Sequence, residues 1–219
     1  MGWAFIALAV IAALVIGYEF IWTDQVAKRA SHNAVNQVQK VWTEGGLTPA
    51  DRPSRSGLNL KPTTDVFAVM RIPRLGSDWQ QPVIEGVESG DLARGVGHYT
   101  MTSMPGVIGN FAVAGHRVTH GHPFYNLDRM QPGDLIGVQM RDVVYVYRAL
   151  SLTVVKPDAV KVLAPTPFKP NVVPTKPMMI ISTCNPRYSA RQRLVLTAET
   201  ITSYPLALAP PDLRAKAQS

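Results

Sequence analysis

The feature that most constrains the fold of this chain is the segment 180–196, in which two apolar runs flank a short polar stretch. The first run ends at Cys184, the only cysteine among 219 residues, and the second begins at Arg193. Asn185-Pro186 follows the cysteine directly and favours a turn. The pattern predicts a strand, a corner and a returning strand, so that Cys184 lies where a strand ends and Arg193 returns beside it.

Other apolar segments from residue 65 onward have the composition and length of β-strands. They are rich in β-branched and aromatic residues and are bounded by glycine and proline turns. Seven or eight strands with few helices, in about 140 residues, are typical of an all-β barrel or sandwich. A proline-rich loop, 156–177, precedes the cysteine-containing strand. The expected strands are 66–72, 82–86, 109–115, 135–140, 143–155, 178–183 and 194–201.

The N-terminal segment is strongly apolar. Residues 1–18 carry no charged side chain, and Glu19 is followed by further apolar residues up to Trp22. At about 1.5 Å per residue in a helix, 1–22 approaches the thickness of a bilayer core, which is about 30 Å. We expect a single-pass transmembrane anchor; a cleaved signal peptide is the alternative, but a positive n-region and a small-residue cleavage site are missing. By the positive-inside rule, Lys28 and Arg29 after this segment favour the opposite orientation to an exported domain.

Two segments separate the expected anchor from the expected barrel. Apolar residues at spacings of three and four predict a stalk helix over 23–43, and a Gly-, Pro- and Ser-containing stretch after it predicts a flexible linker. The tail after Pro205 is broken by prolines, and we expect it to be disordered. The predicted apolar stripe of the helix is Val26, Ala30, Ala34, Val38 and Val41 with Trp42. The predicted domains are an anchor at 1–22, a stalk helix and linker at 23–63, a barrel at 64–205 and a tail at 206–219.

The net charge of +7 raises the question of a nucleic-acid partner. However, no Lys/Arg run is longer than Lys28-Arg29, and aromatic residues do not interleave with basic ones in a stacking pattern. The charge is better explained as a solvated surface, and we expect no nucleic-acid binding.

A lone cysteine in an exported domain is either a buried small hydrophobe or a functional thiol, because cysteines there usually pair. Three arginines after Cys184 favour the thiolate. A cysteine nucleophile also needs a proton shuttle and an oxyanion partner. His116 is the candidate shuttle, because it ends a predicted strand after Ala114-Gly115. On spacing alone, His116, His120 and His122 leave two alternatives open, a zinc site or a loop of exposed rings.

Several short motifs now combine into a resemblance to a known family. Ser182-Thr-Cys184, followed by Arg193-Leu-Val195 and preceded in the chain by Ala114-Gly-His-Arg117, resembles the sortases. These are membrane-anchored cysteine transpeptidases of Gram-positive bacteria. The string Cys184-Asn-Pro-Arg-Tyr-Ser-Ala190 is most similar to class E housekeeping sortases of high-GC actinobacteria. The resemblance covers about residues 64–203.

The resemblance implies an eight-stranded β-barrel without a cofactor or metal. Cys184 would attack the Thr-Gly bond of a C-terminal sorting signal in a secreted protein, and a peptidoglycan-precursor amine would then attack the resulting thioester. His116 would move the protons, and Arg193 would stabilise the oxyanion or hold the substrate backbone. Thr183 and His120 would contact the substrate. The barrel would lie outside the cell membrane, held by residues 1–22.

One position departs from class E. His120 stands where these sortases tend to carry a tyrosine linked to Leu-Ala-X-Thr-Gly recognition, so the choice between Leu-Ala and Leu-Pro motifs stays open. Two other classes also remain. One is a different exported cysteine acyltransferase or peptidase of the wall, although the Ser-His-Gly-Cys motif of L,D-transpeptidases is missing. The other is a membrane-tethered binding module whose cysteine is inert.

Overall fold

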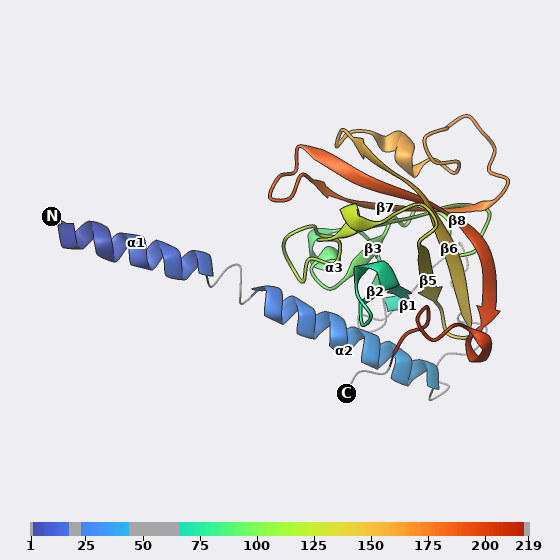
Figure 1. Cartoon of the computed structure of the whole chain (residues 1–219), viewed down its shortest axis with the longest axis horizontal. Coiled ribbons are helices and arrows are strands. Elements are labelled where there is room, and N and C mark those ends of the chain that lie inside the picture. The colour runs from blue at the N-terminus through green and yellow to red at the C-terminus, as the bar shows by residue number, and fades with distance from the viewer. Residues whose placement is uncertain (1, 18–22, 44–65, 217–219) are drawn as a thin grey trace.

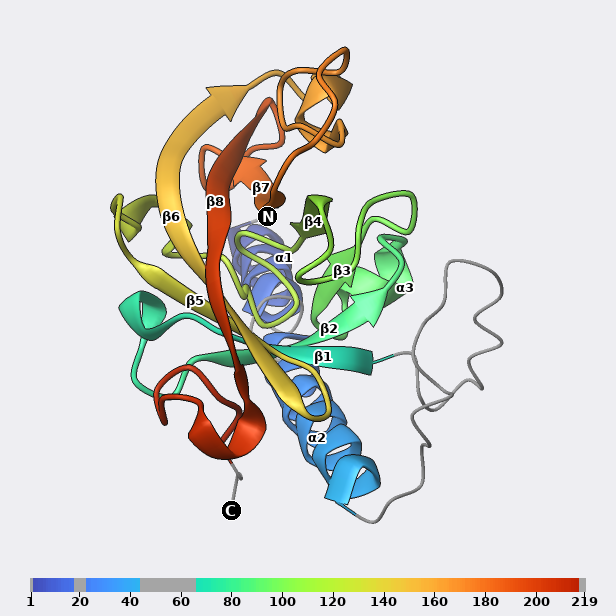
Figure 2. The ribbon, with the colours of Figure 1, turned by 90° about the vertical axis from the view of Figure 1, so that its right-hand side faces the viewer.

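The structure, a computed structural model, describes residues 2–17, 23–43 and 66–216 of the chain. Its strands are β1 (Val66–Arg71), β2 (Gln80–Glu85), β3 (Val96–His98), β4 (Gly109–Ala114), β5 (Leu135–Gln139), β6 (Val143–Val155), β7 (Pro177–Asn185) and β8 (Gln192–Pro205). They form a closed barrel in the order β1-β2-β3-β4-β7-β8-β6-β5 (Figures 1 and 2). The pairs β2/β3 and β4/β7 are parallel and all the others are antiparallel. The eight-stranded barrel implied by the resemblance is confirmed.

Helices are few. Within the described parts of the chain, none is long and apolar enough to cross a membrane. Residues 18–22 of the predicted anchor and the predicted linker after residue 43 lie outside the described residues. The α-helices are α1 (Gly2–Gly17), α2 (Thr23–Thr43) and α3 (Ser89–Leu92), and the 3₁₀ turns are η3 (Pro73–Leu75), η4 (Leu127–Arg129), η5 (Val160–Leu163) and η6 (Leu206–Leu208).

Strand β3 is not among the strands expected from the sequence. It has only three residues, and Gly97 lies at its centre. A Cβ at Gly97 would overlap the carbonyl oxygen of Gly86, so glycine permits the close approach of two backbones. Despite its length, β3 pairs with β2 and β4 and thereby closes the barrel.

Alternating side chains on the strands divide into an interior core and an outer cluster. The outer positions Ala112 on β4, Ile180 on β7 and Val195 on β8 pack together beneath the loop between β6 and β7, which contributes Val162. Because Cys184 is four residues after Ile180, and Arg193 two before Val195, the same period predicts that both side chains face outward. Interior positions on the same strands are Phe111, Val113, Met179, Ile181, Leu194 and Leu196.

Helix α2 packs against β1 and β2 of the barrel (Figure 1). The predicted helical period is confirmed, and Val38 and Trp42 of the predicted stripe pack against the barrel. Val26 is exposed, however, and in the first half of the helix the buried positions lie one residue further along than predicted. The buried positions are set by the barrel surface, where the Ser31 hydroxyl donates a hydrogen bond to Gln81 Oε1 at 2.9 Å. The positions of α2 buried against the barrel are Ala27, Ser31, Val35 and Val38.

The segment after β8 is ordered up to residue 216, so the prediction of a disordered tail is wrong for this part. Leu213 is 2% exposed and packs with Val144 of β6. A Cβ at Gly137 would overlap the Leu213 carbonyl oxygen, so the tail lies directly on β5. The fully buried Arg71 also donates from Nε to the Asp212 carbonyl oxygen at 3.4 Å. Apolar contacts, which the proline-broken sequence did not reveal, therefore hold the tail.

Leu213→Ala should lower the free energy of unfolding by about 2–5 kcal/mol, because it leaves a cavity beneath the tail. Leu208→Ala is the matched control, since Leu208 is 73% exposed and its removal should change stability by less than about 0.5 kcal/mol. Urea unfolding followed by tryptophan fluorescence measures both. Equal, small effects in the two variants would show that the tail does not contribute to the core.

Candidate active site

Cys184 and Arg193 lie directly opposite each other in the sheet. The antiparallel register of β7 and β8 makes their Cα atoms partners, as the sequence pattern predicts. Residues opposite each other in an antiparallel pair project from the same face. This is the outer face of the barrel, because side chains alternate along each strand and Ile180 of β7 and Val195 of β8 lie in the outer cluster. Cys184 is a free cysteine and is half-buried rather than buried.

His116 reaches the same place through the parallel pairing of β4 with β7. Ala114 pairs with Ser182, and the Gly115 amide donates to the Ser182 carbonyl oxygen at 3.2 Å. Strand β4 ends at Ala114. Continued by two residues, the same register predicts that His116 lies near Cys184 and on the same outer face. The end of β4 therefore meets the hairpin between β7 and β8, which is about 70 residues later in the sequence, at one end of the barrel.

The imidazole of His116 is in a partly dry environment. Its ring stacks on that of His120, with centroids 4.7 Å apart and an interplanar angle of 24°. Among the described residues, no hydrogen-bond partner contacts the buried Nε2 of His116. Burial lowers the pKa of His116 below its ordinary value, and the charge of His120 lowers it further. His116 is therefore neutral near pH 7 and can accept a proton.

Arg193 is held at the start of β8 by its own loop. Its Nη1 donates hydrogen bonds to the carbonyl oxygens of Ala190 at 2.9 Å and Gln192 at 3.0 Å. The phenol of Tyr99 lies within its electrostatic reach: burial raises the pKa of Tyr99, and the Arg193 charge opposes that rise. The guanidinium is thus a fixed positive group on the face that carries Cys184.

Thr183 faces the opposite way from Cys184, because neighbouring residues of a strand alternate. It is 3% exposed, and its Oγ1 donates a hydrogen bond to the Gly115 carbonyl oxygen at 2.8 Å. Its expected contact with the substrate stays a prediction. In the structure, Thr183 ties β7 to the residue that precedes His116, and so it helps to hold the two strand ends together.

Two arginines, Arg117 and Arg187, hold the backbone around Cys184 in place. The buried Arg117 donates from Nη1 to the Cys184 carbonyl oxygen at 3.3 Å, and its Nη2 lies 3.2 Å from Asp128 Oδ1. Arg187 donates to both oxygens of Asp128, at 2.9 and 3.0 Å, and its guanidinium lies 4.4 Å from the centre of the Tyr125 ring. Asp128 therefore links the corner after Cys184 to the loop after β4.

The sequence predicts that the three arginines after Cys184, which are Arg187, Arg191 and Arg193, contribute positive charge. Arg187 also holds the corner in place through Asp128, whereas Arg191 is exposed. The Gly-His-Arg string could have indicated Arg117. No sequence pattern links either arginine to Asp128, which is 59 residues from Arg187.

The three histidines considered for zinc do not converge. His116 and His120 stack face to face, while Nδ1 of His122 lies 2.8 Å from Asp24 Oδ1 of α2. Within the described ranges, no three His, Cys, Asp or Glu side chains are grouped so that they could hold a metal ion.

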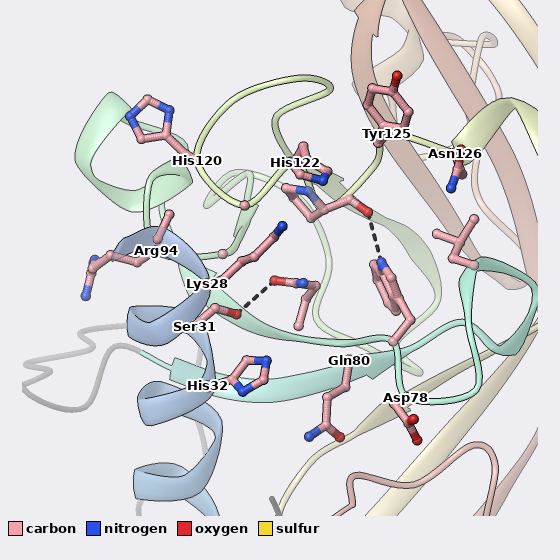
Figure 3. A pocket seen from close by; sticks show the side chains of 17 residues that line it. Lys28, Ser31, His32, Asp78, Gln80, Arg94, His120, His122, Tyr125 and Asn126 are labelled. Atoms are coloured by element: carbon pink, nitrogen blue, oxygen red, sulfur yellow. Dashed lines mark hydrogen bonds between the residues drawn. The ribbon is translucent and has the colours of Figure 1, made fainter. Parts of the chain in front are cut away.

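A cavity of about 300 Å³ lies between α2 and the barrel (Figure 3). Lys28 and His32 of α2 line one side, and His122 and Tyr125 of the loop after β4 line another. His120 stands at its edge, although its ring also stacks on His116. The cavity therefore adjoins the candidate active site without containing Cys184.

The fold and the site together define a closed β-barrel protein with a cysteine, a histidine and an arginine at one end. The sequence matches the sortase domain family over residues 70–201. The chain belongs to the sortase family, whose members are cysteine transpeptidases.

Class E relatives are among the most similar proteins. Sortase SrtE1 of Streptomyces coelicolor is 32% identical over 220 residues, which cover 97% of this chain and 59% of that protein. This chain therefore spans about three-fifths of that relative's length. The structure of sortase E from Streptomyces avermitilis is 35% identical, with a TM-score of 0.62, and covers 68% of this chain and 97% of its own. A structure of sortase E1 from Streptomyces coelicolor with a tripeptide in the active site is 34% identical, with a TM-score of 0.61, and covers 68% and 96%.

Proposed function

We propose that this protein is a membrane-anchored transpeptidase that cuts a Thr-Gly bond in a C-terminal sorting signal and joins the threonine to a peptidoglycan-precursor amine. The observation that supports the proposal is the register of β7 with β8 and of β4 with β7, which pairs Cys184 with Arg193 and brings the end of β4, just before His116, to the same end of the barrel. The tripeptide in the active site of a relative supports a peptide substrate. The half-buried position of Cys184 argues against an inert core cysteine.

In the first half of the proposed reaction, the Cys184 thiolate attacks the threonine carbonyl carbon. Arg193 donates hydrogen bonds to the developing oxyanion. The C–N bond to glycine then breaks, and His116, which has taken up the thiol proton, protonates the departing amine. The products are a thioester between Cys184 and the threonine, and a free peptide that begins with glycine.

In the second half, an amine attacks the thioester carbonyl carbon. His116, now neutral, accepts the proton that the attacking nitrogen loses. The C–S bond breaks, the Cys184 thiolate is released, and an amide joins the threonine to the acceptor. No cofactor takes part, because acyl transfer needs only a nucleophile, a proton shuttle and an oxyanion donor.

We propose further that residues 1–22 anchor the protein, with the barrel on the outer side of the membrane. Helix α1 has no charged residue, and large apolar side chains on it are exposed; Trp3 is one, at 86%. An apolar surface of this kind is unfavourable in water and favourable in lipid. Placement of the barrel outside the membrane gives it access to secreted proteins and wall precursors as partners.

A peptide panel tests this proposal. The full-length protein in detergent is incubated with Leu-Ala-X-Thr-Gly and Leu-Pro-X-Thr-Gly peptides, with and without amine acceptors such as triglycine and diaminopimelate-containing stem peptides. We expect cleavage between threonine and glycine, and a new amide only when an amine is present. A peptide with the order Gly-Thr is the control. If the control is cut equally, or if the cut bond is a D-residue linkage, the proposal is wrong.

A further inference from the structure

The loop that carries His120 has an unusual backbone. Three consecutive residues adopt left-handed conformations: φ is 51° at His120, 75° at Gly121 and 39° at His122. For residues other than glycine, this region costs about 1–2 kcal/mol each. Such a conformation persists only where surrounding contacts hold it. The contacts that hold this loop matter because the His120 ring stacks on His116, the proposed catalytic histidine.

The contacts that hold the loop come from helix α2, which lies outside the barrel. Oδ1 of Asp24, in the first turn of α2, accepts hydrogen bonds from the Gly121 amide and from His122 Nδ1, both at 2.8 Å. Its Oδ2 lies 2.8 Å from Lys28 Nζ. One carboxylate therefore binds two of the three left-handed residues and is itself held by a lysine on the next turn of its helix.

The Asp24 side chain is charged at neutral pH. Burial raises its pKa, but the hydrogen bonds and charges of Lys28 and His122 outweigh that effect, and the net result is a pKa below the ordinary value. Charge-assisted hydrogen bonds of this kind are roughly twice as strong as neutral ones. The hydrogen bonds from Gly121 and His122 to Asp24 therefore offset the backbone strain of this short loop.

Helix α2, which carries Asp24, is attached to the barrel by contacts of its own. Seven residues after Asp24, Ser31 donates to Gln81 of β2, and Val35 and Val38 pack against Val69 of β1. The helix is thus fixed to the barrel by contacts that do not involve the loop. Asp24 can hold the loop only because these other contacts hold the helix.

We propose that Asp24 is a positioning residue for the transpeptidation reaction: from α2, it holds the loop 120–122 so that the His120 ring stacks on His116 and shields it from water. The inference rests on the proposed function for its effect on turnover, but its effect on the geometry of His116 is independent of that function. Helix α2 is then part of the catalytic unit and not only a stalk.

The test compares Asp24→Ala with the wild type in the full chain. The C2 proton of His116 is assigned and titrated by NMR, and kcat and KM are measured against pH with a sorting peptide. The titratable group in contact with His116 is His120, and the register of β4 and β7 brings Cys184 near it; His122 contacts Asp24 and Tyr125, and Lys28 contacts Asp24. We expect the pKa of His116 to rise toward its ordinary value, and kcat to fall about tenfold with little change in KM.

Three further variants sharpen the test. Asp24→Asn keeps an oxygen acceptor at Oδ1, and we expect it to retain the wild-type pKa of His116 and at least a third of the activity. Ser31→Ala removes a bond between the same helix and the barrel but no loop contact, and we expect no shift. His122→Ala removes one of the two loop groups that bond to Asp24, so its effect on the pKa of His116 should not add to that of Asp24→Ala. If Asp24→Ala does not fold, His122→Ala carries the same expected direction.

Two results would overturn the inference. One is an unchanged His116 titration in folded Asp24→Ala. The other is an equal shift in Ser31→Ala, which would assign the effect to helix docking in general. If the wild type cuts no sorting peptide, the proposed function fails, while the NMR titration still decides whether Asp24 positions His120.

Discussion

Cys184→Ala should abolish both cleavage of a sorting peptide and its transfer to an amine, lowering kcat/KM by at least about 10⁴-fold. The reason is that the proposed reaction passes through a thioester, and Cys184 provides the only thiol of the chain. Removing a nucleophile also removes the benefit of the proton shuttle and the oxyanion donor that act with it. Liquid chromatography with mass detection, which separates the substrate, the hydrolysed acid and the amide product, measures both activities.

The control for this variant is its stability. The side chain is small, half-buried and at the end of a strand, so alanine should change the melting temperature by only a few degrees. A folded Cys184→Ala protein that still cut between threonine and glycine would show that another group is the nucleophile. Such a result would leave the cysteine without a role in the reaction.

Arg193→Met should lower kcat/KM by about 10²–10³-fold, the usual effect of removing one oxyanion donor. Methionine keeps much of the length and packing of the side chain but has no N–H group. Arg193→Lys should recover only part of the loss, because an ammonium group is a point charge without the planar fork of a guanidinium. Separate values of kcat and KM are needed, since loss of transition-state contacts lowers kcat.

Arg191 provides the matched control. It carries the same charge two residues earlier, in the loop that precedes β8, and its side chain is exposed. Arg191→Met should therefore reduce the rate less than about threefold, the effect expected from a general change in surface charge. If Arg191→Met and Arg193→Met lost activity equally, the positive field of the loop and not the position of Arg193 would explain the effect.

The sequence predicted the strands that build the site because their signals are local. Both β7 and β8 show continuous apolar runs on either side of one corner, so the pairing of Cys184 with Arg193 follows from a short hairpin. The three-residue β3 gave no such signal, since Gly97 lowers its strand propensity and only its neighbours stabilise it. The phase of α2 and the ordered tail also depend on the surfaces they contact, which no local pattern records.

Among the residues of the candidate site, too, those with a local sequence signal could be predicted and those held by distant contacts could not. His116 could be chosen as a histidine at a predicted strand end, and the family resemblance supported that choice. Asp24 could not be found, because it is 97 residues from Gly121, which it holds. Thr183 was assigned to the substrate because it adjoins Cys184, but adjacent strand residues face opposite sides. Contacts between distant segments, and the direction of each side chain, required the structure.

Intact-protein mass spectrometry of the full-length chain, mixed with a sorting peptide in the absence of an amine, tests the central claim most directly. We expect a mass increase equal to the acyl fragment that ends in threonine, located on Cys184 by peptide mapping and released by hydroxylamine, as is typical of a thioester. Adding an amine should remove the adduct and produce the amide. Cleavage of the Thr-Gly bond without any such adduct, or an adduct on a residue other than Cys184, would contradict the account.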